Sequence, residues 1–513
     1  MLHQENFRHY RSKLCLFISL SLYPVGSAQA DLIGIFGKVK SCIATVLNHD
    51  RKKEYYADFT SFQPASLNEL SALVNIAERY RPLQILGRTV RDRAFEGFPV
   101  TDAALREIGI PARGRRFYDH KTGEFRYQNP YPNQLALENG DQPLKAIRIH
   151  DPTEKLLKDY QTVLEKIQKL ELWIVTSPSL FNKTLSLIEA MPESLQKRIK
   201  MIMATYEGMN WWAQDASKPT LNGAEAVMPK RMASGRELSK YFLPLFSLQQ
   251  GSLVNLSKSA FRFEGGDIIV GEKHVFLGPD AVHMAMEDFQ ISRDEALKAL
   301  STEFGKPVFE VGAPSDNGSL LPITFHIDLT MAVVRDRHTG KEVILLESPR
   351  MALETMLGIP HNQASSEQGY EKISRIVLGL KASDPGYGNG LSFKKIDRVL
   401  PRVQYREKQL EFVERRLRAM GYATQRVPGL TMLEIGNLEE QDIFNYTNSI
   451  LSGHHAIVPE MGVPQLDKEA FDIYRSLGYD VIPMASAYDY FCLYGGPRCA
   501  AETYREPIQG AGH

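Results

Sequence analysis

Residues 172–204 read LWIVTSPSLFNKTLSLIEAMPESLQKRIKMIMA, and the order of elements within this stretch decides the fold class. Leu172–Thr176 and Ile199–Ala204 are short runs rich in apolar and β-branched residues, which predict strands. Between them, Leu180 to Met191 carries apolar residues at helical spacing. Short strands that alternate with helices are typical of an α/β fold.

The same alternation continues toward the C-terminus. Ile268–Val270 and His274–Leu277 predict a β-hairpin around Gly271 and Glu272. Further strands are predicted at 343–346, 456–458 and 480–482, and helices at 294–304, 405–420 and 468–477. Gly478 follows the last helix at a position typical of a left-handed cap. No glycine-rich phosphate turn follows a strand, so these units are not a simple Rossmann series.

The regions before residue 172 differ in character from the alternating part. Residues 31–150 are rich in turn formers and polar residues, and we assign them to an N-terminal region of unknown role. Apolar residues recur at helical spacing through 154–170, which predicts a connecting helix within 151–171. The chain of 513 residues has room for more than one domain.

The first thirty residues have the features of a secretory signal. Basic residues, among them Arg8 and Arg11, precede an apolar run from Leu14 to Val25, and the small residues Ser27 to Ala30 follow. We expect cleavage after Ala30 and a secreted or periplasmic protein without a membrane anchor. The alternative is a buried first helix. The 61 basic and 61 acidic residues balance, which argues against a nucleic-acid partner.

The four cysteines are Cys15, Cys42, Cys492 and Cys499. Signal cleavage would remove Cys15 and leave an odd number. Cys42 and Cys492 have the option of pairing, which the sequence alone does not decide. An unpaired cysteine in an exported protein is either a buried bystander or a reactive thiol. No cysteine or histidine cluster has the spacing of a zinc site, so we expect no metal.

Two segments place carboxylates in positions suited to binding a cation. In Asn210–Pro219, Asp215 follows two tryptophans, and a carboxylate beside an aromatic face suits a flat guanidinium group. In Phe261–Val270, Glu264 directly precedes Gly265-Gly266, where the backbone can approach a ligand closely. Taken singly, each is as well explained by a capping acid or by a tight turn.

Two further segments carry an imidazole and a thiol. In Thr324–Thr330, read as a strand, His326 and Asp328 share one face while Phe325, Ile327 and Leu329 point into the core. A nearby carboxylate favours the imidazolium, which can donate a proton. In Tyr490–Thr503, a Gly-Gly-Pro turn is expected to leave Cys499 accessible, with Arg498 helping to lower the thiol pKa. A structural His–Asp pair and a structural cysteine are the alternatives.

Together and in this order, the four segments resemble the guanidino-modifying superfamily. The matching stretches are Trp212-Ala-Gln-Asp215, Phe263-Glu-Gly-Gly-Asp267, Phe325-His-Ile-Asp328 and Gly495-Gly-Pro-Arg-Cys499, within a resemblance that spans Leu172 to Glu506. The resemblance implies a five-bladed α/β propeller, the pentein fold, and makes residues 172–513 a guanidino-modifying catalytic domain. Val343–Arg350 and Asn445–Ser449 are most similar to protein-arginine deiminases.

The resemblance also implies roles for residues. Cys499 is the expected nucleophile, His326 its acid/base partner, and Asp215 and Asp328 the carboxylates that hold the guanidinium. Further expected substrate contacts are Glu264, Asp267, Trp212 and Asn448. No cofactor is expected; some protein-arginine deiminases need calcium, but no calcium-ligand cluster stands out in the sequence. Two departures lie near the site: Ala216–Pro219 replaces the usual Gly-Pro, and Arg498 replaces a common His.

Three functions agree with these residues. The first is hydrolysis of peptidyl-arginine to peptidyl-citrulline and ammonia, with an arginine-containing peptide or protein as partner. The second is a deiminase or amidinotransferase acting on a free guanidino compound such as arginine or agmatine. The third is an exported protein that binds guanidinium without turnover, an option that the two departures motivate. A Ser/His/Asp hydrolase is disfavoured because no G-x-S-x-G elbow occurs.

Overall fold

The computed structural model describes residues 110–112, 114–119, 121, 124–129, 134–203, 211–230, 245, 248, 253–315, 319–356, 393–431, 443–487, 490 and 495–507. The predicted signal segment, most of the N-terminal region, and the cysteine pair Cys42 and Cys492 lie outside these residues and remain predictions. Within them, no helix combines the length and the apolar character needed to cross a membrane.

The described strands form five sheets of three or four strands, together with three two-stranded pairs, which confirms the mixed α/β class. The five sheets consist of β22 (Ala501–Arg505), β3 (Leu144–His150), β4 (Glu171–Thr176) and β5 (Ile199–Met203); β6 (Lys218–Pro219), β7 (Glu225–Met228) and β8 (Asn255–Lys258); β9 (Ile268–Val270), β10 (Val275–Leu277) and β11 (Val308–Glu310); β14 (Met331–Arg335), β15 (Glu342–Ser348) and β16 (Ala423–Pro428); and β19 (Ile450–Ser452), β20 (His455–Pro459) and β21 (Asp480–Met484).

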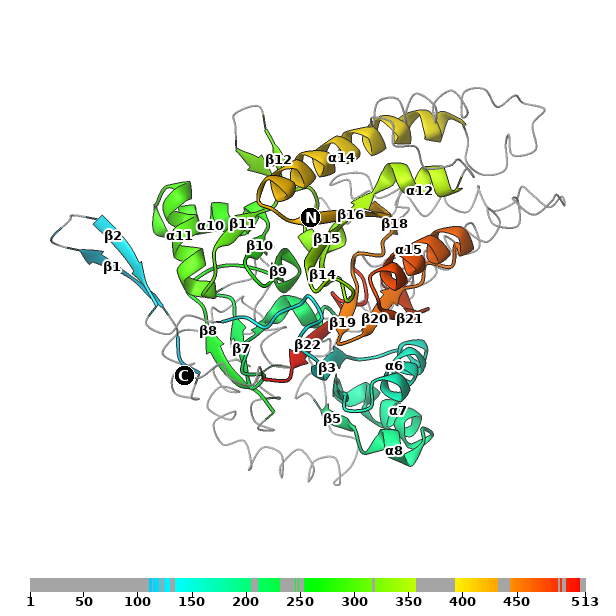
Figure 1. Cartoon of the computed structure of the whole chain (residues 1–513). Helices are drawn as coiled ribbons and strands as arrows, with labels where there is room; N and C mark the ends of the chain where they lie inside the picture. The colour runs from blue at the N-terminus through cyan, green and yellow to red at the C-terminus, as the bar shows by residue number, and fades with distance from the viewer. Residues whose placement is uncertain are drawn as a thin grey trace, which may run out of the picture.

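One pairing pattern recurs in all five sheets. The first two strands pair antiparallel, and the next strand joins in parallel. A parallel neighbour needs a crossover, which is usually helical. The crossovers contain α6 (Glu154–Lys166), α7 (Pro178–Glu189), α8 (Glu193–Gln196), α10 (Pro279–Phe289), α11 (Arg293–Phe304), α12 (Pro349–Met356), α14 (Phe393–Ala419) and α15 (Pro464–Ser476). These helices lie around the outside of the strands (Figure 1).

The segment before β3 connects the sheets to one another. Backbone hydrogen bonds join residues 134–143 to residues in or beside the first strand of every sheet: Ala136 to Pro219, Glu138 to Val270, Asn139 to Arg335, Gly140 to Gly453 and Pro143 to Glu506. The C-terminal strand β22 pairs with β3, so the two ends of the described chain meet in one sheet. Residues 134–150 are therefore part of the same body as the region that we predicted to start at residue 172.

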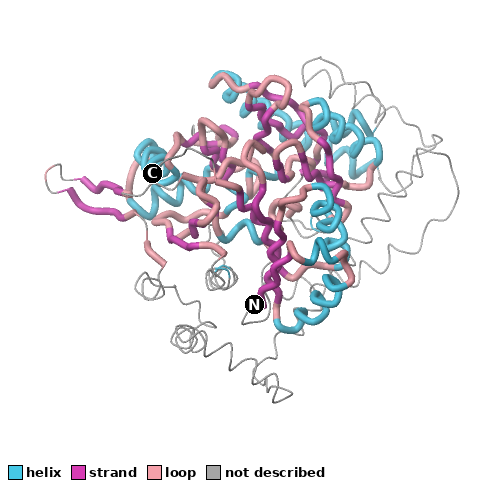
Figure 2. Tube along the Cα trace, turned by 60° about the horizontal axis from the view of Figure 1, so that its bottom comes forward, coloured by secondary structure: helices cyan, strands magenta, loops and turns pink. Residues whose placement is uncertain are grey.

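Most of the predicted elements occur within a few residues of their expected limits. The helix predicted at 405–420 is longer, because α14 begins at Phe393. The turn-rich region contains a hairpin, β1 (Arg115–Asp119) and β2 (Glu124–Gln128), which projects from the rest of the described chain (Figure 2). The expected strand over 324–330 is wrong: this stretch is irregular and contains the short helix η5 (Ile327–Leu329). The two short pairs β12–β13 (Ala313–Pro314 and Leu320–Leu321) and β17–β18 (Leu430–Thr431 and Ile443–Phe444) complete the list.

The cap that follows α15 provides a test of local packing. Gly478 has a φ of +84°, and a Cβ atom there would lie 2.7 Å from Cβ of Arg337. Gly421 has the same φ of +84° but nothing within 4 Å. We expect Gly421→Ala to lower the free energy of unfolding by about 1 kcal/mol through backbone strain alone. Gly478→Ala adds a clash with Arg337. It should therefore lower the free energy of unfolding by about 2 kcal/mol or more, measured by urea titration.

Candidate active site

Five short segments carry the candidate residues, and each directly precedes the first strand of one sheet. The 3₁₀ turn η3 (Ala213–Ala216) holds Asp215 before β6, η4 (Gly265–Asp267) follows Glu264 before β9, and η5 holds Asp328 before β14. Asn448 and Cys499 stand two residues before β19 and β22. Because the first strands are all joined through residues 134–143, the segments before them converge.

The thiol of Cys499 lies inside this convergence and is 2% exposed, so the accessible position expected from the sequence is wrong. The side-chain amide of Asn448 donates to Sγ at 3.2 Å. Its carbonyl oxygen accepts from the backbone N–H groups of Arg498 at 2.9 Å and Cys499 at 3.3 Å. Asn448 thus fixes the nucleophile loop. The carboxylate oxygens of Asp328 lie 3.6 and 3.9 Å from the sulfur.

The imidazole of His326 lies between two carboxylates. Its Nε2 is 2.7 Å from Oε2 of Glu264, and its Nδ1 is 3.8 Å from Oδ1 of Asp215. Burial alone would lower the pKa of His326, but the charge of Asp215 and the contacts with Cys499 and Glu264 raise it well above its ordinary value. The ring is therefore an imidazolium at neutral pH. Phe325 does not enter the core; it is 36% exposed and lies against the imidazole, with ring centroids 4.5 Å apart.

The structure brings together the four residues expected to act in catalysis. Ligand atoms of His326, Asp328 and Cys499 all lie within 4.8 Å of one another, as do those of Asp215, Glu264 and His326. Each of these five residues is at most 4% exposed. Sulfur, imidazole and carboxylate are also zinc ligands, and both groups have the spacing of a metal site. A metal bound there would occupy the sulfur or the imidazole.

Two expected substrate contacts have other neighbours. Asp267 belongs to neither of these groups: its carboxylate packs against Gly278, where a Cβ atom would come within 1.9 Å of it. Burial raises the pKa of Asp267 well above its usual range, which favours the neutral form of this carboxyl group. Trp212 packs against the nucleophile loop at Gly495, where a Cβ atom would lie 2.4 Å from the indole ring. A contact of either residue with substrate remains a prediction.

The free thiol is poorly ionised. Burial and the negative charge of Asp328 raise the pKa of Cys499 to about 11, although His326 acts in the opposite direction. Arg498 does not reverse this, contrary to the expectation from the sequence, because its guanidinium pairs with Asp328 and with Glu138. A cation placed between Asp328 and the sulfur would favour the thiolate.

The raised pKa of Cys499 predicts that a neutral and a cationic alkylating reagent will modify this thiol with different pH dependence. Neutral chloroacetamide should modify Cys499 with a rate that rises across pH 9 to 11, because only the thiolate reacts. Cationic chloroacetamidine brings its own positive charge and should react measurably near neutral pH. Mass spectrometry of the Cys499 peptide separates this thiol from the other cysteines. A neutral reagent that titrates the thiol below about pH 9 would contradict the interpretation.

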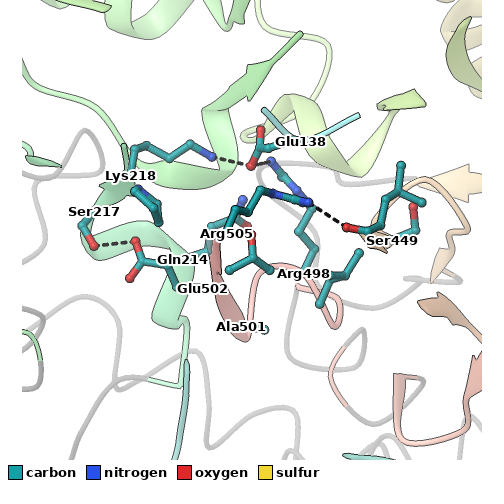
Figure 3. Close-up of a pocket in the computed structure, with 13 residues that line it drawn as sticks. Glu138, Gln214, Ser217, Lys218, Ser449, Arg498, Ala501, Glu502 and Arg505 are labelled. Carbon is teal, nitrogen blue, oxygen red and sulfur yellow. Dashed lines mark hydrogen bonds and ion pairs between the residues drawn. The ribbon is translucent and has the colours of Figure 1, made fainter. Parts of the chain in front are cut away.

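An ion-pair network behind the nucleophile was not anticipated. Glu138 accepts from Nζ of Lys218 at 2.9 Å and from Nη2 of Arg498 at 2.7 Å, as Figure 3 illustrates for the lysine. Arg498 also binds Asp328, and Gln214, with its amide oxygen toward Arg498, accepts from both Nη atoms. Lys218 lies within Ala216–Pro219, the first departure noted in the sequence, and Arg498 is the second. Both bind Glu138, a residue of the segment that the sequence left without a role.

Comparison with known proteins gives structural likeness at low identity. No family model matches the chain, and no curated protein matches it. An agmatine deiminase from C. jejuni has a TM-score of 0.47 and 13% identity, over 73% of this chain and 97% of its own. An agmatine deiminase of Enterococcus faecalis has 0.44 and 12%, over 74% and 100%. A dimethylarginine dimethylaminohydrolase has 0.33 and 12%, over 70% and 100%. All three carry the names of guanidino-modifying enzymes, the class that the sequence motifs resemble.

Proposed function

We propose that this chain hydrolyses a guanidinium group through a covalent bond to Cys499. One observation carries the proposal: a buried thiol, an imidazolium and three carboxylates meet with their functional atoms only a few ångströms apart. Asp328 pairs with Arg498, and the carboxylates of Asp215 and Glu264 both lie against the imidazole of His326. This cluster of buried carboxylates suits a monovalent, planar cation that donates several charge-assisted hydrogen bonds.

The first half of the reaction forms a carbon–sulfur bond. The bound guanidinium favours ionisation of Cys499, whose proton passes to solvent, and the thiolate attacks the central guanidinium carbon. Asp215 and Asp328 accept hydrogen bonds from its nitrogens and fix the plane of attack. His326 gives its proton to the departing nitrogen, which leaves as ammonia when it is unsubstituted. The product of this half is a thiouronium held on Cys499.

The second half breaks the carbon–sulfur bond. His326, now neutral, takes a proton from water, and the resulting hydroxide equivalent attacks the thiouronium carbon. The sulfur leaves as thiolate, the hydroxyl proton passes to solvent, and the carbon retains the oxygen as the carbonyl of a ureido group. Each step uses side chains of this chain and water alone. Glu264 holds the imidazole through its hydrogen bond to Nε2.

We also propose that the five sheets are the blades of a five-bladed propeller. The shared pairing pattern, the helical crossovers and the closure of the first sheet by β22 support this arrangement. In such a fold the inner strands surround a central axis, and residues 134–143 would lie along it. The convergence of five pre-strand segments on one site then follows from the pseudo-symmetry of the blades.

The substrate belongs to one of two classes: a free guanidino compound, such as arginine or agmatine, or arginine within a peptide. Ammonia release should be measured with arginine, agmatine and an arginine peptide blocked at both ends, with and without calcium. A free-substrate enzyme recognises the α-amino or carboxylate group, or the agmatine amine, and leaves the blocked peptide unchanged. A peptidyl enzyme gives the reverse order. An amidinotransferase would release ammonia only slowly unless an amine acceptor is added.

A binding protein without turnover would behave differently. It would retain guanidino compounds in equilibrium dialysis but release no ammonia and form no adduct at Cys499. Covalent labelling of Cys499 by chloroacetamidine, together with ammonia release from any of the three substrates, supports the enzyme. The absence of both with intact, folded protein would refute the proposed reaction.

A further inference from the structure

A small cavity lies beside the ion-pair network; Arg498 lines it, and Cys499 does not. It is lined by Glu138, Lys218, Arg498, Glu502 and Arg505, among others (Figure 3). The space admits only a water molecule or an ion of similar size. A second small cavity shares Glu138 and Arg498 with it. The cavity is separate from the group formed by Cys499 and His326, which does not line it.

Arg505 lines this cavity and is a buried cation without an ion pair to any described residue. Its side chain is 2% exposed. Nη1 donates to the carbonyl oxygens of Gln142 at 2.7 Å and Leu451 at 2.9 Å, whereas Nε has no hydrogen-bond partner among the described residues. No ion pair joins this guanidinium to a carboxylate of the described residues, although the charges of Glu138 and Asp141 act on it from farther away. Burial lowers the pKa of Arg505 to about 10, which still leaves it charged at pH 7.

The other charges around the cavity are paired. Lys218 and Arg498 share Glu138, Arg498 also binds Asp328, and Arg148 binds Glu502. With Arg505 there are four buried cations for three carboxylates. All three hydrogens of the Lys218 ammonium are used by Glu138 and the carbonyls of Gly265 and Ile268. The guanidinium of Arg505 therefore has no ion-pair partner of its own among these groups, and a buried charge without a close counterion is costly.

The carboxylates of Asp215 and Glu264 do not serve this purpose, because they lie around His326, at the place that we assign to the substrate cation. Coulombic compensation also weakens with distance, so a counterion for Arg505 is most effective within the cavity itself.

We propose that this cavity is a binding site for one small monovalent anion of chloride size, held by Arg505 and by the positive field of Lys218 and Arg498. Larger anions do not fit the space, and carboxylates of the chain already occupy the other cations. Arg498 lines the cavity and precedes the nucleophile, so the bound anion stabilises the segment that carries Cys499. It takes no part in bond making.

The test compares halides with an anion too large to enter. At equal ionic strength, wild-type protein should melt about 1–3 °C higher in sodium chloride or bromide than in sodium gluconate, since only a bound ion stabilises by mass action. Arg505→Met should lose this difference, and Arg505→Lys should keep most of it. Arg418→Met, at an exposed arginine on α14, is the matched control and should retain the wild-type difference.

Crystals grown with sodium bromide give an independent readout that needs no variant. An anomalous peak in the cavity beside Nε of Arg505 supports the proposal. A cavity without anomalous signal in crystals that contain bromide, or a melting difference equal in wild type and Arg505→Met, overturns it in favour of ordinary buried water. Neither result depends on whether the chain turns over a guanidino substrate, so the proposed reaction and the anion site are tested separately.

Discussion

Cys499→Ser should reduce ammonia release from the best guanidino substrate by a factor of about 10³ or more, with little change in substrate affinity. A hydroxyl is a far weaker nucleophile than a thiolate, and His326, already protonated, is a poor base for a serine proton. The carboxylates that would hold the cation are untouched. The effect should therefore appear in kcat rather than in KM.

The serine substitution should leave the structure of the nucleophile loop unchanged. The Asn448 amide donates to Sγ at 3.2 Å and can donate equally to a hydroxyl, so the loop should keep its position. Mass spectrometry of protein quenched during turnover should reveal a covalent adduct in wild type and none in the variant. Retention of more than about a tenth of the wild-type kcat would exclude Cys499 as nucleophile.

The sequence was most informative where a residue's chemistry depends on its immediate neighbours. The segments that carry Asp215, Glu264, His326 and Cys499 resemble those of the guanidino-modifying superfamily, and this resemblance predicted one site; the structure brings these groups together. The geometry that accomplishes this was predicted wrongly at His326, because an apolar alternation over 324–330 favours a strand. The chain instead turns through η5, a local choice set by contacts with the neighbouring pre-strand segments.

The ion-pair network behind the nucleophile was beyond sequence reasoning for a different reason. Glu138 is an ordinary acidic residue in a polar, turn-rich stretch, and its partners Lys218 and Arg498 lie far along the chain. Each partner was noticed only as a departure from a family pattern. Their common partner depends on tertiary structure, so no local period or spacing signals it. The raised pKa of Cys499 was missed for the same reason, since it is a consequence of burial.

The two departures therefore have a structural explanation that bears on specificity. Arg498 binds one oxygen of Asp328 and leaves the rest of that carboxylate for a substrate nitrogen. Lys218 and Arg498 together satisfy Glu138, which would otherwise be a buried, uncompensated acid. These substitutions do not remove any group that the proposed reaction requires. The interpretation of the chain as a binding protein without turnover consequently loses its original motive.

His326→Gln should lower kcat by about 10²- to 10⁴-fold, the range expected when a general acid and base is removed. Glutamine can still donate a hydrogen bond to Glu264, but it carries no charge and gives no proton to the departing nitrogen. His326 lowers the pKa of Cys499, so its loss should push that pKa above the wild-type value of about 11. The residual activity of the variant should thus increase with pH throughout the alkaline range.

The activity of the wild-type protein should instead decrease with pH at the alkaline end of its pH profile. Once the pH exceeds the raised pKa of His326, the leaving nitrogen has no proton donor and the rate should fall. His274→Gln is the matched control, because this half-buried histidine hydrogen-bonds Tyr422 at 2.6 Å and belongs to neither group around the thiol. It should leave the pH profile unchanged. Two results would contradict the acid/base role of His326: a kcat of His326→Gln within about threefold of wild type at neutral pH, or an alkaline decline of its activity like that of wild type. In either case the proton for the leaving nitrogen would have to come from another group.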